Sequence, residues 1–163
     1  LAHDCVVSRT KLNKHDRHLI EMTLYKAYIP KDAYDPDAIL TNLIPFVNDA
    51  IGFHMSSEIL LYYNMYCFGT ADAISFNEKE KLLRVHDLKT GTTPAHMEQL
   101  MIYAALFCLE YHKNPKQFNT ELRIYQNFDI IISNPTGDEI EDYMNLIQNR
   151  SKLILSYLER EGK

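Results

Sequence analysis

Residues 55 to 89 decide the fold, and they read MSSEILLYYNMYCFGTADAISFNEKEKLLRVHDLK. The stretch is rich in Ile, Leu, Val, Tyr and Phe, and turn-forming residues interrupt it near Asn64 and at Asn77-Glu78. We therefore expect three consecutive strands, at about 55–64, 66–76 and 81–89. The connections between them are too short for parallel crossovers, so these strands should form an antiparallel meander.

Helical patterns flank the meander on both sides. Before it we expect a helix at about 15–28 and another at about 36–51, with Pro36 in the first turn of the second helix. After it, Pro94 should open a helix that reaches about residue 112, and residues 120–132 are typical of a fourth strand. An amphipathic helix follows at about 138–160.

This order of elements predicts an α+β fold, a mixed α/β sandwich in which helices flank a central and mostly antiparallel sheet. A chain of 163 residues suits one domain that spans 1–163. Within it we expect N-terminal helices over about 15–51, a core over about 55–132 and a C-terminal helix over about 138–160.

The charges are unevenly distributed along the chain. The formal charge of −5 at first argues against a partner as acidic as nucleic acid. However, residues 1–31 hold six Lys and Arg against three Asp and Glu, whereas residues 32–78 hold seven acids and no Lys or Arg. A solubilising surface normally mixes both signs. The acidic stretch therefore indicates either an acidic face or carboxylates that bind a cation.

The cysteines and the hydropathy indicate the cellular compartment in which we expect the chain. Cys5, Cys67 and Cys108 form no CxxC pair and no zinc pattern, which favours a reducing compartment. No apolar run approaches the roughly 20 residues of a spanning helix, and no secretory signal stands at the start. We expect a cytoplasmic protein without a membrane partner.

Two charged residues close the third predicted strand. Asp87 and Lys89 point to the same face because strand side chains alternate, and taken alone they read as a simple ion pair. Asp72 changes this interpretation, because it lies in an otherwise apolar strand that the next turn can bring beside Asp87. Glu58 adds a third acid in the same meander. Carboxylates this close need protonation, a cation or ample water, and a hard divalent metal is the cation that their oxygens select.

These residues resemble a known family. Glu58, the string Phe68-Gly69-Thr70-Ala71-Asp72, the string Asp87-Leu88-Lys89-Thr90-Gly91 and the helical Gln99-x-x-x-Tyr103 pattern are similar to the RecB-like branch of the PD-(D/E)xK nuclease superfamily, which includes Cas4-type and phage exonucleases. The resemblance is strong over residues 55–105 and weak elsewhere. It implies a restriction-endonuclease-like core.

The resemblance also implies roles for individual residues. Asp72, Asp87, the Leu88 carbonyl and Glu58 would hold Mg²⁺ or Mn²⁺, while Lys89 would orient or deprotonate the attacking water. Gln99 and Tyr103, one helical turn apart, would hold a phosphate. Members of this branch often add a histidine from an early helix, for which His18 is the first candidate and His15 the second. No cysteine follows Cys108, so we expect no iron–sulfur cluster.

The function implied is divalent-metal-dependent hydrolysis of DNA, as an exonuclease in recombination, repair or phage DNA processing. The alternatives are a catalytically silent module that binds nucleic acid, and an endonuclease on the same scaffold. No GxxxxGK[ST] motif is present, so translocation along DNA would need a partner such as a helicase. A recombinase or annealing protein is a second kind of partner, and a homo-oligomer remains open. A phage-encoded member would act in the host cytoplasm.

Overall fold

The computed structural model describes residues 1–91 and 93–161. Its elements follow one another in the order α1 (Ala2–Val7), α2 (Arg17–Lys26), the 3-10 turn η1 (Lys31–Ala33), α3 (Pro36–Gly52), β1 (Ser56–Asn64), β2 (Cys67–Asn77), β3 (Leu82–Leu88), α4 (Glu98–Glu110), the 3-10 turn η2 (Pro115–Gln117), β4 (Asn119–Gln126), β5 (Asp129–Ser133) and α5 (Gly137–Arg160).

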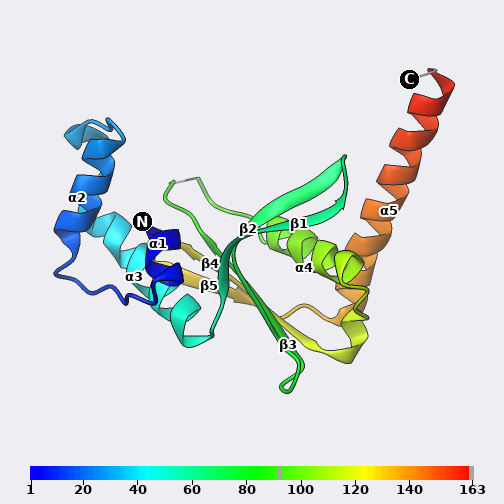
Figure 1. Ribbon diagram of the computed structural model, residues 1–163, viewed down its shortest axis with the longest axis horizontal. Helices are drawn as coiled ribbons and strands as arrows, with labels where there is room; N and C mark the ends of the chain where they lie inside the picture. Colours follow the sequence, from blue (N-terminus) through cyan, green and yellow to red (C-terminus); the bar gives the residue numbers. More distant parts are fainter. Residues whose placement is uncertain (92, 162–163) are drawn as a thin grey trace.

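The strands form one five-stranded sheet in the order β1-β2-β3-β4-β5 (Figure 1). Neighbouring strands are antiparallel except β3 and β4, which are parallel and are joined through α4. A parallel pair needs a long crossover, and α4 supplies it. The predicted meander, the α+β class and the mostly antiparallel sheet are thus confirmed.

Helices cover the two faces of the sheet with separate cores. On one face, α4 and α5 pack on Leu83, Val85, Leu122 and Ile124. On the other face, α1, α2 and α3 enclose a second core that includes Phe46 of α3 and Tyr125 of β4. In Figure 1 the first three helices lie on one side of the sheet and α4 and α5 on the other.

The predicted strand at 120–132 is wrong in one respect, because the structure divides it into β4 and β5. The turn between them holds Asn127 and Phe128 at positive φ, 52° and 65°. Two successive positive φ values are typical of the type I′ turn that joins tight hairpins. Neither residue is glycine, so this turn carries only a weak sequence signal.

One helix and one helix boundary also differ from the prediction. The short helix α1 was not expected, since its six residues are too few to show a clear periodicity. Helix α4 begins at Glu98 and not at Pro94, and residues 94–96 form no regular element. The described residues before α4 are held by hydrogen bonds from Gln126 of β4, which are given below.

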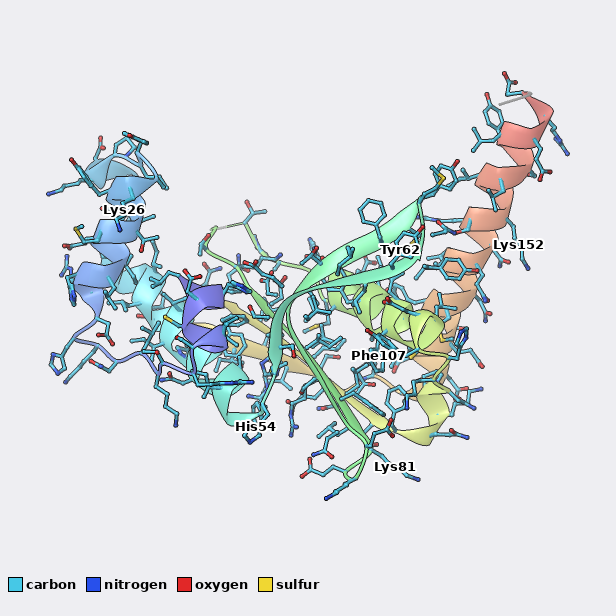
Figure 2. The ribbon with its side chains drawn as sticks, in the orientation of Figure 1. Lys26, His54, Tyr62, Lys81, Phe107 and Lys152 are labelled. Carbon is cyan, nitrogen blue, oxygen red and sulfur yellow. The ribbon has the colours of Figure 1, made fainter. Side chains whose placement is uncertain are left out.

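The β1–β2 hairpin changes direction where the acidic residues lie. Ala71 belongs to the core on the α4 face and Ala73 to the core on the α3 face, although residues two apart on a regular strand share a face. Opposite this break, Glu58 of β1 has a φ of 54°, which is strained for a residue with a side chain. In Figure 2 the hairpin runs from His54, after α3, to Tyr62 at its far part.

Candidate active site

The two aspartates meet where β2 and β3 stop pairing. The last paired residues are Ala73 and His86, so continuing the register by one residue sets Asp72 opposite Asp87. Here Asp72 Oδ2 accepts a hydrogen bond of 2.9 Å from the Leu88 backbone N–H. The carboxylate thus takes the place of a backbone acceptor in the ladder, which fixes its position at the fork between the strands.

Asp87 is buried, with 3% of its surface exposed, and it faces the α4 side of the sheet. Its Oδ1 accepts a 3.1 Å hydrogen bond from Lys89 Nζ. The other oxygen, Oδ2, lies 2.9 Å from the same nitrogen in an ion pair, without a hydrogen bond from the described part of the chain. The ammonium group thus offsets the charge of both oxygens, and Oδ2 keeps lone pairs that a cation could use.

A chain of hydrogen bonds continues from Lys89 into α4. Lys89 Nζ donates to Gln99 Oε1 at 3.0 Å, and Gln99 Nε2 donates to the Tyr103 hydroxyl at 2.8 Å. Because the hydroxyl oxygen accepts here, its own proton is free to be donated elsewhere. Lys89 has three N–H groups, and the described contacts use two acceptors, Asp87 and Gln99.

Gly69 makes room for the Tyr103 ring, the last group in this run of hydrogen bonds. A Cβ atom placed on Gly69 would lie 2.7 Å from Cε1 of Tyr103, which no real contact allows. The glycine of the Gly-Thr-Ala-Asp string therefore lets the Tyr103 ring lie against β2. The ring then reaches the same sheet end as Asp72, three residues further along the strand.

Glu58 lies on the other side of the fork, beside a cavity of about 190 Å³ between the sheet, α1 and α3. Asp72 and Leu88 also line this cavity, as does His3 of α1. The His3 Nδ1 atom is 3.6 Å from Glu58 Oε2, just beyond hydrogen-bond distance. Sequence reasoning missed His3, whose helix is too short to be recognised.

The candidate histidines His18 and His15 lie elsewhere. His18 is exposed on α2, where the neighbouring Arg17 pairs with Glu21, and His15 is exposed before the same helix. Neither of them lines the cavity that holds Glu58 and Asp72. If an N-terminal histidine contributes to this site, the structure favours His3.

Burial and the neighbouring charges raise two pKa values in the site. Burial raises the pKa of Asp72, and the charges of Asp87 and Glu58 raise it further, against the Leu88 hydrogen bond and the charge of Lys89. Burial also raises the pKa of Tyr103, and the charges of Asp87 and Asp72 act in the same direction. Both groups therefore hold their proton more tightly than the free side chains do, and a bound cation would oppose this shift.

These donors fit a hard divalent cation. Asp72, Asp87, Glu58 and the Leu88 carbonyl are all oxygen ligands, and the buried Asp87 Oδ2 lacks a hydrogen bond. In the part of the chain that the structure describes, no three His, Cys, Asp or Glu side chains form a ready-made cage.

Gln126 holds the segment between Lys89 and Gln99. Its side chain is buried, and its Nε2 donates to the carbonyls of Gly91 and Thr93 at 2.7 and 2.8 Å. Its Oε1 accepts from the Ala95 N–H at 2.9 Å. All the hydrogen-bonding groups of this amide are thereby used on one loop. No strand pattern reveals such a role, because a buried glutamine in a strand has many possible partners.

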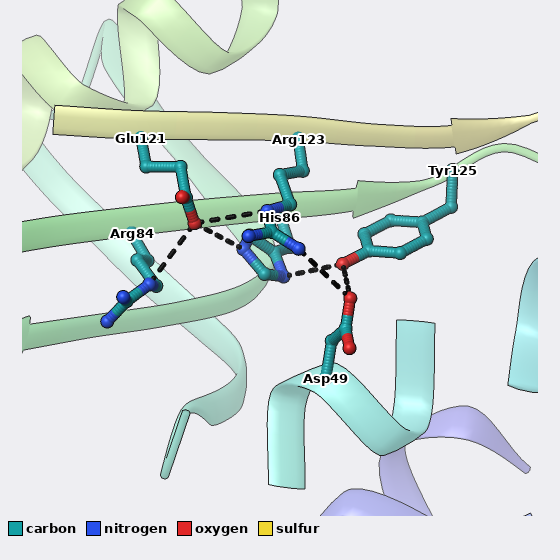
Figure 3. A network of polar contacts seen from close by, with 6 residues as sticks. All are labelled: Asp49, Arg84, His86, Glu121, Arg123 and Tyr125. Carbon is teal, nitrogen blue, oxygen red and sulfur yellow. Dashed lines mark hydrogen bonds and ion pairs between the residues drawn. The ribbon is translucent and has the colours of Figure 1, made fainter. Parts of the chain in front are cut away.

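A polar network supports β3 from the α3 face (Figure 3). His86, adjacent to Asp87, is fully buried with its Nδ1 3.2 Å from the Tyr125 hydroxyl, which donates to Asp49 of α3 at 2.7 Å. Arg84 and Arg123 both donate to Glu121. Burial and the charge of Arg123 lower the pKa of His86 to about 3, so the ring is neutral. The network fixes α3 against the strands that carry Asp87 and Gln126.

Comparison with known proteins adds no relative. No family model matches the chain, and no curated protein is similar enough in sequence to count as related. Among the helices described, none is both long and apolar enough to cross a membrane. The functional interpretation therefore rests on the geometry of the site and on the resemblance of its motifs.

Proposed function

We propose that the chain is a divalent-metal-dependent nuclease that hydrolyses phosphodiester bonds in DNA as an exonuclease. The observation that carries this proposal is the run of contacts from Asp87 through Lys89 and Gln99 to Tyr103, beside the second carboxylate of Asp72. Acids that can bind a cation, an ammonium group and neutral donors are the groups that stabilise the charge developing on a phosphoryl centre.

Each group has a role consistent with its contacts. Asp72, Asp87, Glu58 and the Leu88 carbonyl would hold Mg²⁺ or Mn²⁺, which supplies Lewis-acid stabilisation to the phosphate when bound. Lys89 has an N–H left to orient the attacking water or to offset negative charge, and its amine can take the proton of that water once it is deprotonated itself. The free proton of the Tyr103 hydroxyl suits a non-bridging phosphate oxygen.

The test is a time course on end-labelled linear, nicked and closed circular DNA with Mg²⁺ and with Mn²⁺. We expect nucleotide release from linear DNA that stops when the metal is chelated. Asp87→Ala and Lys89→Ala should each lower the rate at least 100-fold, the lower end of what a positioned acid–base group contributes. Glu80→Gln, an exposed change in the β2–β3 turn, should leave the rate unchanged.

The other outcomes distinguish the alternatives. Cleavage of closed circular DNA would identify an endonuclease, because that substrate has no ends. A mobility shift without product would identify a binding module. A folded Asp87→Ala protein that degrades DNA as fast as the parent would contradict the assignment of this site.

A further inference from the structure

A second cavity lies directly beyond the candidate active site. It measures about 270 Å³ and is lined by α3, by the Thr90-Gly91 segment and by the β4–β5 turn. This volume is just under the roughly 300 Å³ at which pockets for drug-sized ligands begin, so it suits a single flat ring system. The cavity borders Thr90, the residue that follows Lys89.

Phe128 stands at the rim of this cavity in an unusual state. Its side chain is 68% exposed, and its backbone is held at a φ of 65°. An exposed aromatic residue at positive φ loses stability on both counts, and such strain persists where the surroundings enforce it, often at functional sites. The enforcing contact is a hydrogen bond of 3.1 Å from the Phe128 N–H to Asn42 Oδ1 of α3. Tyr34 supplies a second aromatic ring to the lining.

Asn42 supplies an unused donor. Its side chain lines the cavity and is 9% exposed, and its oxygen is occupied by the Phe128 N–H. Its amide nitrogen donates no hydrogen bond to any residue that the structure describes. This nitrogen is not among the fully enclosed side-chain atoms of the described residues, so solvent reaches it and an acceptor on a ligand can take the place of that water. Asparagine side chains are suited to the polar edges of nucleobases.

The chemistry of the lining disfavours an anionic ligand. The lining contains aromatic rings, aliphatic side chains of α3, the amides of Asn42 and Asn127 and the carboxylate of Asp35, but no Lys or Arg. A phosphate would find no cation here, whereas a base can stack on an aromatic ring and accept from an amide. The distance from the candidate active site is also suitable. Asn42 lines this cavity and Phe46 lines the cavity beside Glu58 and Asp72, and the two residues lie about 6 Å apart along α3.

We infer that this cavity binds an unpaired nucleobase of the DNA strand whose phosphate lies in the active site. The base stacks on Phe128, and Asn42 donates a hydrogen bond to its edge. The inference rests on the proposed nuclease function and specifies its substrate as a strand with at least one unpaired nucleotide beside the scissile bond.

The test measures binding of 5′-labelled single-stranded oligonucleotides by fluorescence anisotropy, with Ca²⁺ in place of Mg²⁺ to limit turnover. One abasic site is moved stepwise along the oligonucleotide. We expect one position, or two adjacent positions, at which base removal weakens binding about tenfold, as for loss of a single base stack. In Phe128→Ala that positional dependence should disappear, and the intact oligonucleotide should bind about tenfold more weakly.

Phe128→Gly separates a binding role from a structural one. Glycine adopts positive φ without strain, so this variant should have a higher melting temperature than the parent while its affinity for DNA falls. Tyr157→Ala replaces an exposed aromatic residue of α5 away from the cavity, and it should alter neither the melting temperature nor the affinity for DNA. Asn42→Asp, which keeps the acceptor for Phe128 and removes the donor, should weaken binding as well.

The outcomes separate the two proposals. Tight binding by the parent with no sensitive abasic position, or with unchanged affinity in Phe128→Ala and Phe128→Gly, overturns the base pocket and leaves the nuclease proposal intact. A parent that cleaves no DNA and binds none overturns both.

Discussion

Asp72 shows at the scale of one residue how a group of the candidate site can oppose stability. Its carboxylate is partly buried beside Asp87 and Glu58, and its chief compensation is the hydrogen bond from the Leu88 N–H. The position in the ladder is correct for either an acid or an amide, since both have an oxygen that can accept this bond. Only the acid adds the negative charge that a bound divalent cation would offset.

We therefore expect Asp72→Asn to stabilise the metal-free protein and to abolish its activity. The amide keeps the acceptor for Leu88 and removes a desolvated charge, so the free energy of unfolding should rise by about 1 kcal/mol. Denaturant unfolding with and without Mg²⁺ measures both effects. Mg²⁺ should stabilise the parent and not the variant. A variant less stable than the parent in chelator would contradict this account.

The site residues were predictable from sequence to an uneven degree. Strand alternation and one short turn bring Asp72, Asp87 and Lys89 together. Helical spacing places Gln99 and Tyr103 on one face, but it is the resemblance of their motif that marks them as site residues. Each of these relations is local. His3 depends on a contact with a strand more than fifty residues away, and no local pattern encodes it.

At the scale of the element, the segment from Thr90 to Met97 joins the two halves of the site. Its described residues, 90–91 and 93–97, form no helix or strand, yet Lys89 Nζ before the segment and Gln99 Oε1 after it lie 3.0 Å apart. Gln126 of β4 fixes its path through three hydrogen bonds. The sequence predicted a helix from Pro94, because proline favours a first turn, but these tertiary contacts outweigh that preference.

We expect Gln126→Leu to reduce activity more than its loss of stability explains. It leaves two carbonyls and one N–H of the loop without partners and should cost about 2–3 kcal/mol of the free energy of unfolding. At a temperature where all variants are folded, kcat should still fall about tenfold or more, because Lys89 and Gln99 lose their fixed separation. The kcat and the free energy of unfolding of Gln126→Glu should lie between those of the parent and of Gln126→Leu, since glutamate keeps the acceptor for the Ala95 N–H.

Gln117→Leu is the matched control for this change. Gln117 is exposed in η2, so its substitution should alter neither the free energy of unfolding nor kcat. If Gln126→Leu keeps the parental kcat while folded, the loop does not position the site.

At the scale of the whole molecule, two helical layers are held on one sheet by different means. The α4–α5 layer rests on an apolar core, whereas the α3 layer adds the polar network of His86, Tyr125 and Asp49. The layers and the meander followed from hydrophobic periodicity. The network did not, because its members lie on α3, β3 and β4, and only the register of the parallel pair β3–β4 brings them together.

The neutral His86 makes stability depend on pH. Its pKa is about 3 in the folded protein and near 6.5 in the unfolded chain, because burial and the charge of Arg123 disfavour its cation. Between these values the unfolded chain binds the extra proton, so stability is full above pH 6.5 and falls by up to about 1.4 kcal/mol per unit as pH drops below it.

Unfolding curves from pH 8 to pH 4 test this expectation against His86→Gln, whose side chain does not titrate. The difference in the free energy of unfolding between parent and variant should narrow steadily below pH 6.5. A constant difference across that range would show that His86 takes up no proton on unfolding.

The dependence of the loop on Gln126 has a consequence for the order of assembly. The two acids come together in one hairpin, β2–β3, and hairpins form in about 1–10 μs. The hydrogen bonds that hold the loop between Lys89 and Gln99 join residues 31 to 35 positions apart. They can form only after β4, which carries Gln126, has joined the sheet. A nascent chain that has not yet delivered Gln126 thus carries its acidic pair without a fixed Lys89 and Gln99. Under the proposed function, it would remain harmless to nearby DNA until β4 docks.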